Sequence, residues 1–310
     1  MTQNALASYR DDASESEKAL YAFLAEKHRR SGSQRTVQGY NGMLLHFFGT
    51  LGKGPDQVAS TDVFAWAHGA GLSGKAPSST TVGARIACLS SFYRFLIRMS
   101  LVTTNPCDML ERPRARESVP RGLGADDIKK LLGVIPETKS GFRDKAIILT
   151  LVFTGRRRTE VLSLKSGDLR WENGSVFYRY RGKGGKTGRR ELPRPAWGAV
   201  LAMCEAWARP FDELAPDAPL WPSNAGTKGL TSGTFYGNLR RYLKAAGLPL
   251  SGVHVFRHSA AKLRRDAGQT VEEVSRFLDH SSLAVTTTYL RRLEGQADTA
   301  WERVAEAIGI

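Results

Sequence analysis

Four short segments in the second half of the chain gather arginine, lysine, histidine and tyrosine side chains. Thr154–Glu160 contains three consecutive arginines, and Gly182–Gly188 is a glycine-rich run with two lysines. His254–His258 holds an arginine between two histidines, and Tyr289 follows His280 by nine residues. Arginine donates paired hydrogen bonds to phosphate oxygens, histidine and lysine can transfer protons, and tyrosine can act as a covalent nucleophile. These residue types together suit chemistry at a phosphodiester.

The four segments resemble the motifs of the tyrosine recombinase or phage integrase family. Those motifs read T-G-x-R-x-x-E, G-K-G-x-K, H-x-x-R-H, and L-G-H followed nine residues on by a tyrosine. Each motif is weak alone, and the resemblance rests on their joint order and spacing. It covers the whole second domain and, more loosely, the helical first domain of Xer-like members. The resemblance implies a site-specific DNA recombinase that works through a 3′-phosphotyrosyl intermediate and a Holliday junction, without ATP.

The resemblance also assigns roles to individual residues. Tyr289 is the expected nucleophile, and its phenol must lose its proton as it attacks phosphorus. Arg157 and Arg257 are expected to bind the non-bridging oxygens, on which charge accumulates. His254 would accept the tyrosine proton or share the oxyanion charge, and His280 would donate to a phosphate oxygen. No metal or cofactor is expected, because two guanidinium groups carry the charge that Mg²⁺ carries in other phosphoryl transfers.

The departing deoxyribose oxygen needs a general acid, and two lysines compete for that role. The resemblance favours Lys183, which lies in the glycine-rich tip of a predicted β-hairpin. The tip has extra residues before Pro193 compared with the usual family pattern. Lys186 therefore remains an alternative to Lys183 as the acid.

Two positions depart from the family motifs. Arg156 stands where the family usually has an apolar residue, and Asp279 stands where the family has the glycine of L-G-H. Aspartate tolerates a left-handed backbone better than most residues, so the turn at Asp279 is expected to survive. Glu160 lies three residues after Arg157 on one helix face, and we expect it to orient that arginine.

The pattern of apolar residues predicts a mainly α protein with a small antiparallel β-sheet. Residues 14–105 show apolar side chains at three- and four-residue steps, which indicates a compact helical domain. The family resemblance implies that it is a SAM-like core DNA-binding domain. Residues 106–123 form a predicted basic linker, because this stretch is rich in proline and arginine. Residues 124–310 form the predicted catalytic domain, in which Ser175–Arg181 and Arg190–Pro193 would pair as a hairpin.

The composition agrees with two domains and a polyanionic partner. The chain has 310 residues, a net charge of +15 and a pI near 10.0, which favours binding to nucleic acid. The N-terminal residues do not resemble a secretory signal, and no apolar run is long enough for a membrane span, so a cytoplasmic protein is expected. Its three cysteines are predicted to be reduced thiols in apolar surroundings.

Double-stranded DNA is the expected partner, and the expected assembly is a homotetramer on DNA. Trp301, Val304 and Ile308 recur at helical steps near the C-terminus, and in the family such a tail docks on a neighbouring subunit. A type IB topoisomerase is the rival enzyme, because it uses the same chemistry but rejoins the original strand. A catalytically silent DNA-binding protein of the same fold is the rival from another class.

Overall fold

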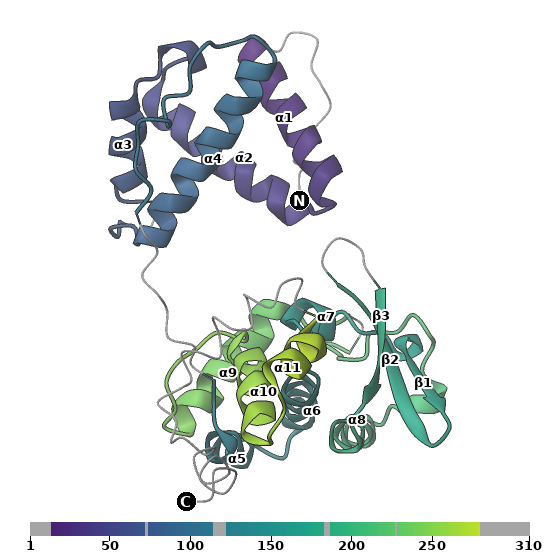
Figure 1. The fold of residues 1–310 in the computed structure, drawn as a ribbon. Helices are drawn as coiled ribbons and strands as arrows, with labels where there is room; N and C mark the ends of the chain where they lie inside the picture. Colours follow the sequence, from purple (N-terminus) through teal and green to yellow (C-terminus); the bar gives the residue numbers. More distant parts are fainter. Residues whose placement is uncertain (1–13, 72–73, 114–121, 183–186, 227, 280–310) are drawn as a thin grey trace, which may run out of the picture. The chain divides into compact units, whose positions relative to one another are not determined.

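The chain divides into two compact units, residues 1–118 and 119–310, each with its own hydrophobic core (Figure 1). The computed structural model describes residues 14–71, 74–113, 122–182, 187–226 and 228–279. The division after Ser118 falls within the predicted linker, of which residues 114–121 lie outside the described part.

The first unit is helical in its described residues. Its helices are α1 (Glu15–Ser31), α2 (Gln34–Leu51), α3 (Ser60–His68) and α4 (Ser79–Arg98), with a 3-10 turn at Pro55–Gln57. Ser14 caps α1, and its backbone N–H donates to Oε2 of Glu17 at 2.8 Å. Phe23 of α1 meets Phe92 of α4 edge to face, with ring centroids 5.2 Å apart. The predicted helical N-terminal domain is thereby confirmed.

In its described residues, the second unit combines helices with one small sheet. Its helices are α5 (Ala125–Gly133), α6 (Lys139–Thr154), α7 (Arg158–Leu162), α8 (Arg194–Ala206), α9 (Ser232–Ala245), α10 (Val255–Asp266) and α11 (Val271–Leu278), with 3-10 turns at Ser166–Asp168 and Phe211–Glu213. The mostly apolar α6 packs against α8 and α10, and it lies between them in Figure 1. Most of its side chains are buried, so α6 is the central helix of this unit.

The sheet has three antiparallel strands in the order β1 (Leu169–Glu172), β2 (Ser175–Arg181) and β3 (Thr187–Leu192). The predicted extent of β2 is confirmed, whereas β3 begins three residues earlier than predicted. β1 was not predicted. Asn173 and Gly174 connect β1 to β2 with φ values of 48° and 78°, the left-handed backbone that a two-residue hairpin turn requires.

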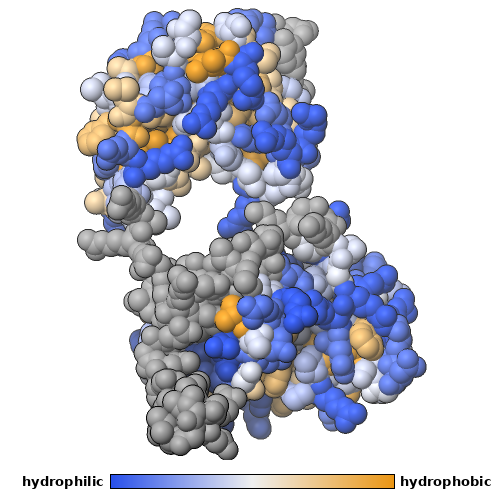
Figure 2. All heavy atoms as spheres, viewed as in Figure 1, coloured by the Kyte–Doolittle hydropathy of each residue, from blue (hydrophilic) through white to orange (hydrophobic). Residues whose placement is uncertain are grey.

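The surface over the sheet is mostly hydrophilic, as the blue spheres at the right of the lower unit in Figure 2 show. Arg179, Arg181, Arg189 and Arg190 are exposed on β2 and β3 and make this hairpin strongly basic. Among the described residues, no helix has the length and apolar character needed to cross a membrane. The three cysteines are buried and free, as predicted.

Candidate functional site

The site is built around the connection between α6 and α7. Gly155 ends α6 with φ +60°, and its N–H donates to the Leu151 carbonyl oxygen at 2.9 Å. A Cβ at Gly155 would lie 2.7 Å from side-chain atoms of both Leu278 and Phe277. Only glycine therefore combines this left-handed turn with such close packing against the end of α11. After this turn, Arg157 is the residue just before α7.

Glu160 holds Arg157 by two hydrogen bonds. The Arg157 backbone N–H donates to Oε2 of Glu160 and its guanidinium Nη1 donates to Oε1, both at 2.9 Å. The Glu160 side chain is 3% exposed, whereas that of Arg157 is 34% exposed. The contact expected between these two residues is present, and it leaves the guanidinium of Arg157 accessible at the surface.

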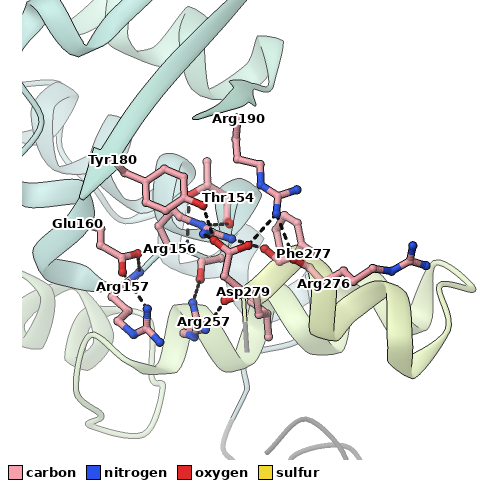
Figure 3. Close-up of polar contacts among 12 residues, drawn as sticks. Thr154, Arg156, Arg157, Glu160, Tyr180, Arg190, Arg257, Arg276, Phe277 and Asp279 are labelled. Atoms are coloured by element: carbon pink, nitrogen blue, oxygen red, sulfur yellow. Dashed lines mark hydrogen bonds and ion pairs between the residues drawn. The ribbon is translucent and has the colours of Figure 1, made fainter. Parts of the chain in front are cut away.

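Arg257 lies on the first turn of α10 and is buried. Its Nη1 donates to the Gly155 carbonyl oxygen at 2.7 Å, and its Nη2 donates to the Leu278 carbonyl oxygen at 2.6 Å. Arg257 thus joins the α6–α7 connection to the end of α11 (Figure 3).

His254 directly precedes α10 and is partly exposed. Partial burial lowers the pKa of His254, and the positive charges of Arg158, Arg257 and Arg157 lower it further. A neutral imidazole at physiological pH can accept a proton. The structure therefore brings together three of the predicted site residues, Arg157, His254 and Arg257.

Asp279 ends α11 in the left-handed conformation that the sequence led us to expect, with φ 51°. Its carboxylate accepts hydrogen bonds from Arg156, Tyr180 and Arg190 (Figure 3). Partial burial favours protonation of Asp279, but the Tyr180 hydroxyl and the charges of Arg156 and Arg190 outweigh it and lower the pKa to about 2. Arg156, the other departure from the family motif, is thus a buried arginine with a specific partner.

Four of the predicted residues lie outside the described part of the chain: Lys183, Lys186, His280 and Tyr289. The elements next to them are described. β2 ends at Arg181 and β3 begins at Thr187, on either side of the two lysines, and Asp279 directly precedes His280.

Sequence reasoning missed three residues of this region. Arg158 acts electrostatically on His254, and within the described residues its buried Nε has no hydrogen-bond partner. Tyr180 and Arg190 reach Asp279 from the hairpin, across 99 and 89 residues of sequence. Local spacing carries no signal for contacts over such separations. The three consecutive arginines were a signal for Arg158, which lies one residue after Arg157.

The fold is that of a tyrosine recombinase, and the comparison of sequences identifies the same family. The chain belongs to the phage integrase family: the model for that family matches residues 121–295, and the model for the phage integrase N-terminal SAM-like domain matches residues 18–100. Tyrosine recombinase XerD of Rhizobium meliloti is 30% identical over 280 residues, which cover 86% of this chain and 87% of the relative. Tyrosine recombinase XerC of Shewanella amazonensis is 29% identical over 267 residues, covering 84% and 86% of the two chains.

Solved structures share the fold. Lambda integrase 75–356, as a dimer bound to a COC′ core site, matches with a TM-score of 0.68 and 20% identity, covering 91% of this chain and 98% of that one. XerH site-specific recombinase, in a post-cleavage complex with a palindromic difH substrate, matches with a TM-score of 0.65 and 21% identity, covering 98% and 92%. Both likenesses extend over the two units of the chain.

Proposed function

We propose that this chain is a site-specific recombinase that cuts and rejoins double-stranded DNA. The Tyr289 oxygen attacks a backbone phosphorus, forms a 3′-phosphotyrosyl bond and releases a 5′-hydroxyl. A 5′-hydroxyl from a partner duplex then attacks that bond, which joins the strands and frees the tyrosine. The bond energy stays in the covalent intermediate, so no ATP is consumed. Two rounds of exchange pass through a Holliday junction.

The observation that carries this proposal is the convergence of Arg157, Arg257 and His254. Two guanidinium groups that act electrostatically on one neutral imidazole fit a phosphate that gains negative charge during attack. The imidazole accepts the phenolic proton or shares the oxyanion charge. Lys183, with Lys186 as the alternative, protonates the leaving oxygen, and His280 donates to a phosphate oxygen. The two arginines supply the positive charge, so the proposal includes no metal or cofactor.

DNA is the substrate that the charge and the relatives support. The net charge of +15 favours a polyanion, and both solved structures named above hold recombination-site DNA. We assign residues 14–105 to a core DNA-binding domain and residues 124–310 to the catalytic domain. The basic linker 106–123 would contact phosphates of the DNA. Assembly as a homotetramer on DNA and a cytoplasmic location also belong to this proposal.

A deletion assay tests the proposed function. A supercoiled plasmid carrying two directly repeated copies of the site, taken from the DNA that flanks the gene, is incubated with the protein. Recombination predicts two smaller circles, which restriction digestion identifies. Relaxed plasmid without smaller circles would indicate a topoisomerase instead. Bound but unchanged plasmid would indicate a silent DNA-binding protein.

A further inference from the structure

The two residues that depart from the family motifs, Arg156 and Asp279, are in direct contact. Nη1 of Arg156 donates to the Asp279 carboxylate, and Nη2 donates to the Phe277 carbonyl oxygen. Nε donates to the Thr154 carbonyl oxygen at 3.2 Å, so all three nitrogens of the guanidinium are bound. The Arg156 side chain is 1% exposed, and its guanidinium carbon lies 4.6 Å from the centroid of the Tyr180 ring.

Asp279 also connects to the hairpin. Nη2 of Arg190 donates to Asp279 at 2.7 Å and to the Arg276 carbonyl oxygen at 3.1 Å. The Tyr180 hydroxyl donates to the same carboxylate. Gly188, the cross-strand partner of Tyr180, makes this possible, because a Cβ there would lie 2.3 Å from the tyrosine ring. Asp279 is therefore the meeting point of α11, the α6–α7 connection and the β2–β3 hairpin (Figure 3).

The Arg156–Asp279 contact lies immediately beside the two carbonyl groups that hold Arg257. Arg257 binds the carbonyl oxygens of Gly155 and Leu278, the residues that precede Arg156 and Asp279 in the chain. A bond between Arg156 and Asp279 therefore fixes the spacing of the two acceptors. If that bond is lost, the acceptors can separate and the guanidinium of Arg257 loses its defined orientation.

We propose that Arg156 and Asp279 are a positioning pair for Arg257, an inference that rests on the proposed function. The pair sets where the Arg257 guanidinium points, and Arg257 in turn contacts the phosphate. Stability alone gives little reason for such a pair, because Asp279 is 35% exposed and an ion pair in contact with solvent contributes little. The family usually has an apolar residue and a glycine at these two positions.

Single-turnover cleavage of a nicked site at saturating DNA tests this pair. We expect Arg156→Met and Asp279→Gly each to slow formation of the covalent adduct by about tenfold, because each breaks the Arg156–Asp279 bond while the other member of the pair stays in place. In Arg156→Met, Asp279 still has Arg190 as an ion-pair partner. The double variant Arg156→Met/Asp279→Gly restores the family-like pair and should recover to within about threefold of wild type. The dissociation constant for DNA should change little. Arg98→Met removes the same charge from the exposed Arg98–Glu26 pair and should cleave like wild type.

The possible results separate this inference from the proposed function. The positioning pair would be overturned if folded Arg156→Met formed the adduct at the wild-type rate. It would also be overturned if the rate decrease in the double variant equalled the product of the decreases in the two single variants. Recovery of the melting temperature without recovery of the rate would also overturn it, because the pair would then be structural only. If Arg156→Met does not fold, Asp279→Asn takes its place, because asparagine has the size of aspartate and tolerates the left-handed backbone. Slower adduct formation by Asp279→Asn would support the pair, and a wild-type rate would overturn it. No adduct from wild-type protein on DNA that it binds would refute the proposed function itself.

Discussion

Glu160 accepts two hydrogen bonds from Arg157, one from its backbone N–H and one from its guanidinium, each 2.9 Å long. The carboxylate is buried in the short helix α7, so it cannot move without disturbing that helix. Arg157 is consequently held from both its backbone and its side chain. If Arg157 binds the scissile phosphate, the position of its guanidinium at that phosphate depends on Glu160.

We expect Glu160→Ala to slow single-turnover cleavage at saturating DNA by about 10- to 100-fold. This range corresponds to the loss of one hydrogen bond between charged groups, worth about 1.5–3 kcal/mol. Glu160→Gln keeps an acceptor for the backbone N–H of Arg157, so its cleavage rate should decrease less than that of Glu160→Ala. Glu205→Ala, at an exposed glutamate of α8, is the matched control. Equal rates for Glu160→Ala and Glu205→Ala would show that Arg157 needs no such support.

The turn at Gly155 should not tolerate a side chain. Gly155→Ala places a Cβ within 2.7 Å of both Leu278 and Phe277 and forces alanine to φ +60°. We expect the free energy of unfolding to fall by about 2–4 kcal/mol, from overpacking and left-handed strain together. Urea denaturation measures the change. Gly237→Ala, in the exposed middle of α9 with open space around its Cβ, should instead raise stability by about 0.5–1 kcal/mol.

Local sequence signals predicted much of this fold, and the structure shows where they stop. The contact between Glu160 and Arg157 is present as predicted, because it depends on residues only three positions apart. β1 was missed although Asn173–Gly174 is a turn signal, because the strand before it has only four residues. The Arg156–Asp279 contact was not predictable, since it spans 123 residues and joins two deviations from the family pattern.

The stability of the protein should fall on mild acidification through His258. Burial lowers the pKa of His258 from 6.5 to about 4, and the charges of His254 and Arg257 act in the same direction. The unfolded chain therefore binds a proton at His258 that the folded chain does not. The free energy of unfolding should be fully retained above pH 6.5 and decrease as the pH falls toward 4.

Urea denaturation at pH 7 and pH 5 measures this dependence. His258→Gln should have a smaller difference between the two pH values than wild type. His68→Gln, at an exposed histidine of α3, keeps His258 and should retain most of the wild-type difference. Identical pH dependence for His258→Gln and wild type would show that His258 does not contribute.

A modified substrate distinguishes the two candidate general acids. Lys183→Ala should slow cleavage of ordinary DNA by about 10²- to 10⁴-fold, the usual contribution of a general acid. A sulfur in place of the bridging 5′-oxygen leaves as a thiolate, which needs no proton, so this substrate should restore the rate of the variant. Lys186→Ala should slow cleavage of ordinary DNA less, and the sulfur-containing substrate should raise its rate less. The opposite pattern would assign the acid to Lys186.

Covalent trapping tests most directly whether Tyr289 attacks DNA. Wild-type protein and Tyr289→Phe are incubated with nicked DNA carrying the site, and adducts are separated on a denaturing gel. We predict an adduct with wild type and none with Tyr289→Phe, at equal DNA binding by both proteins. An adduct that persists in Tyr289→Phe would place the nucleophile elsewhere, and no wild-type adduct on DNA that the protein binds would contradict the recombinase chemistry altogether.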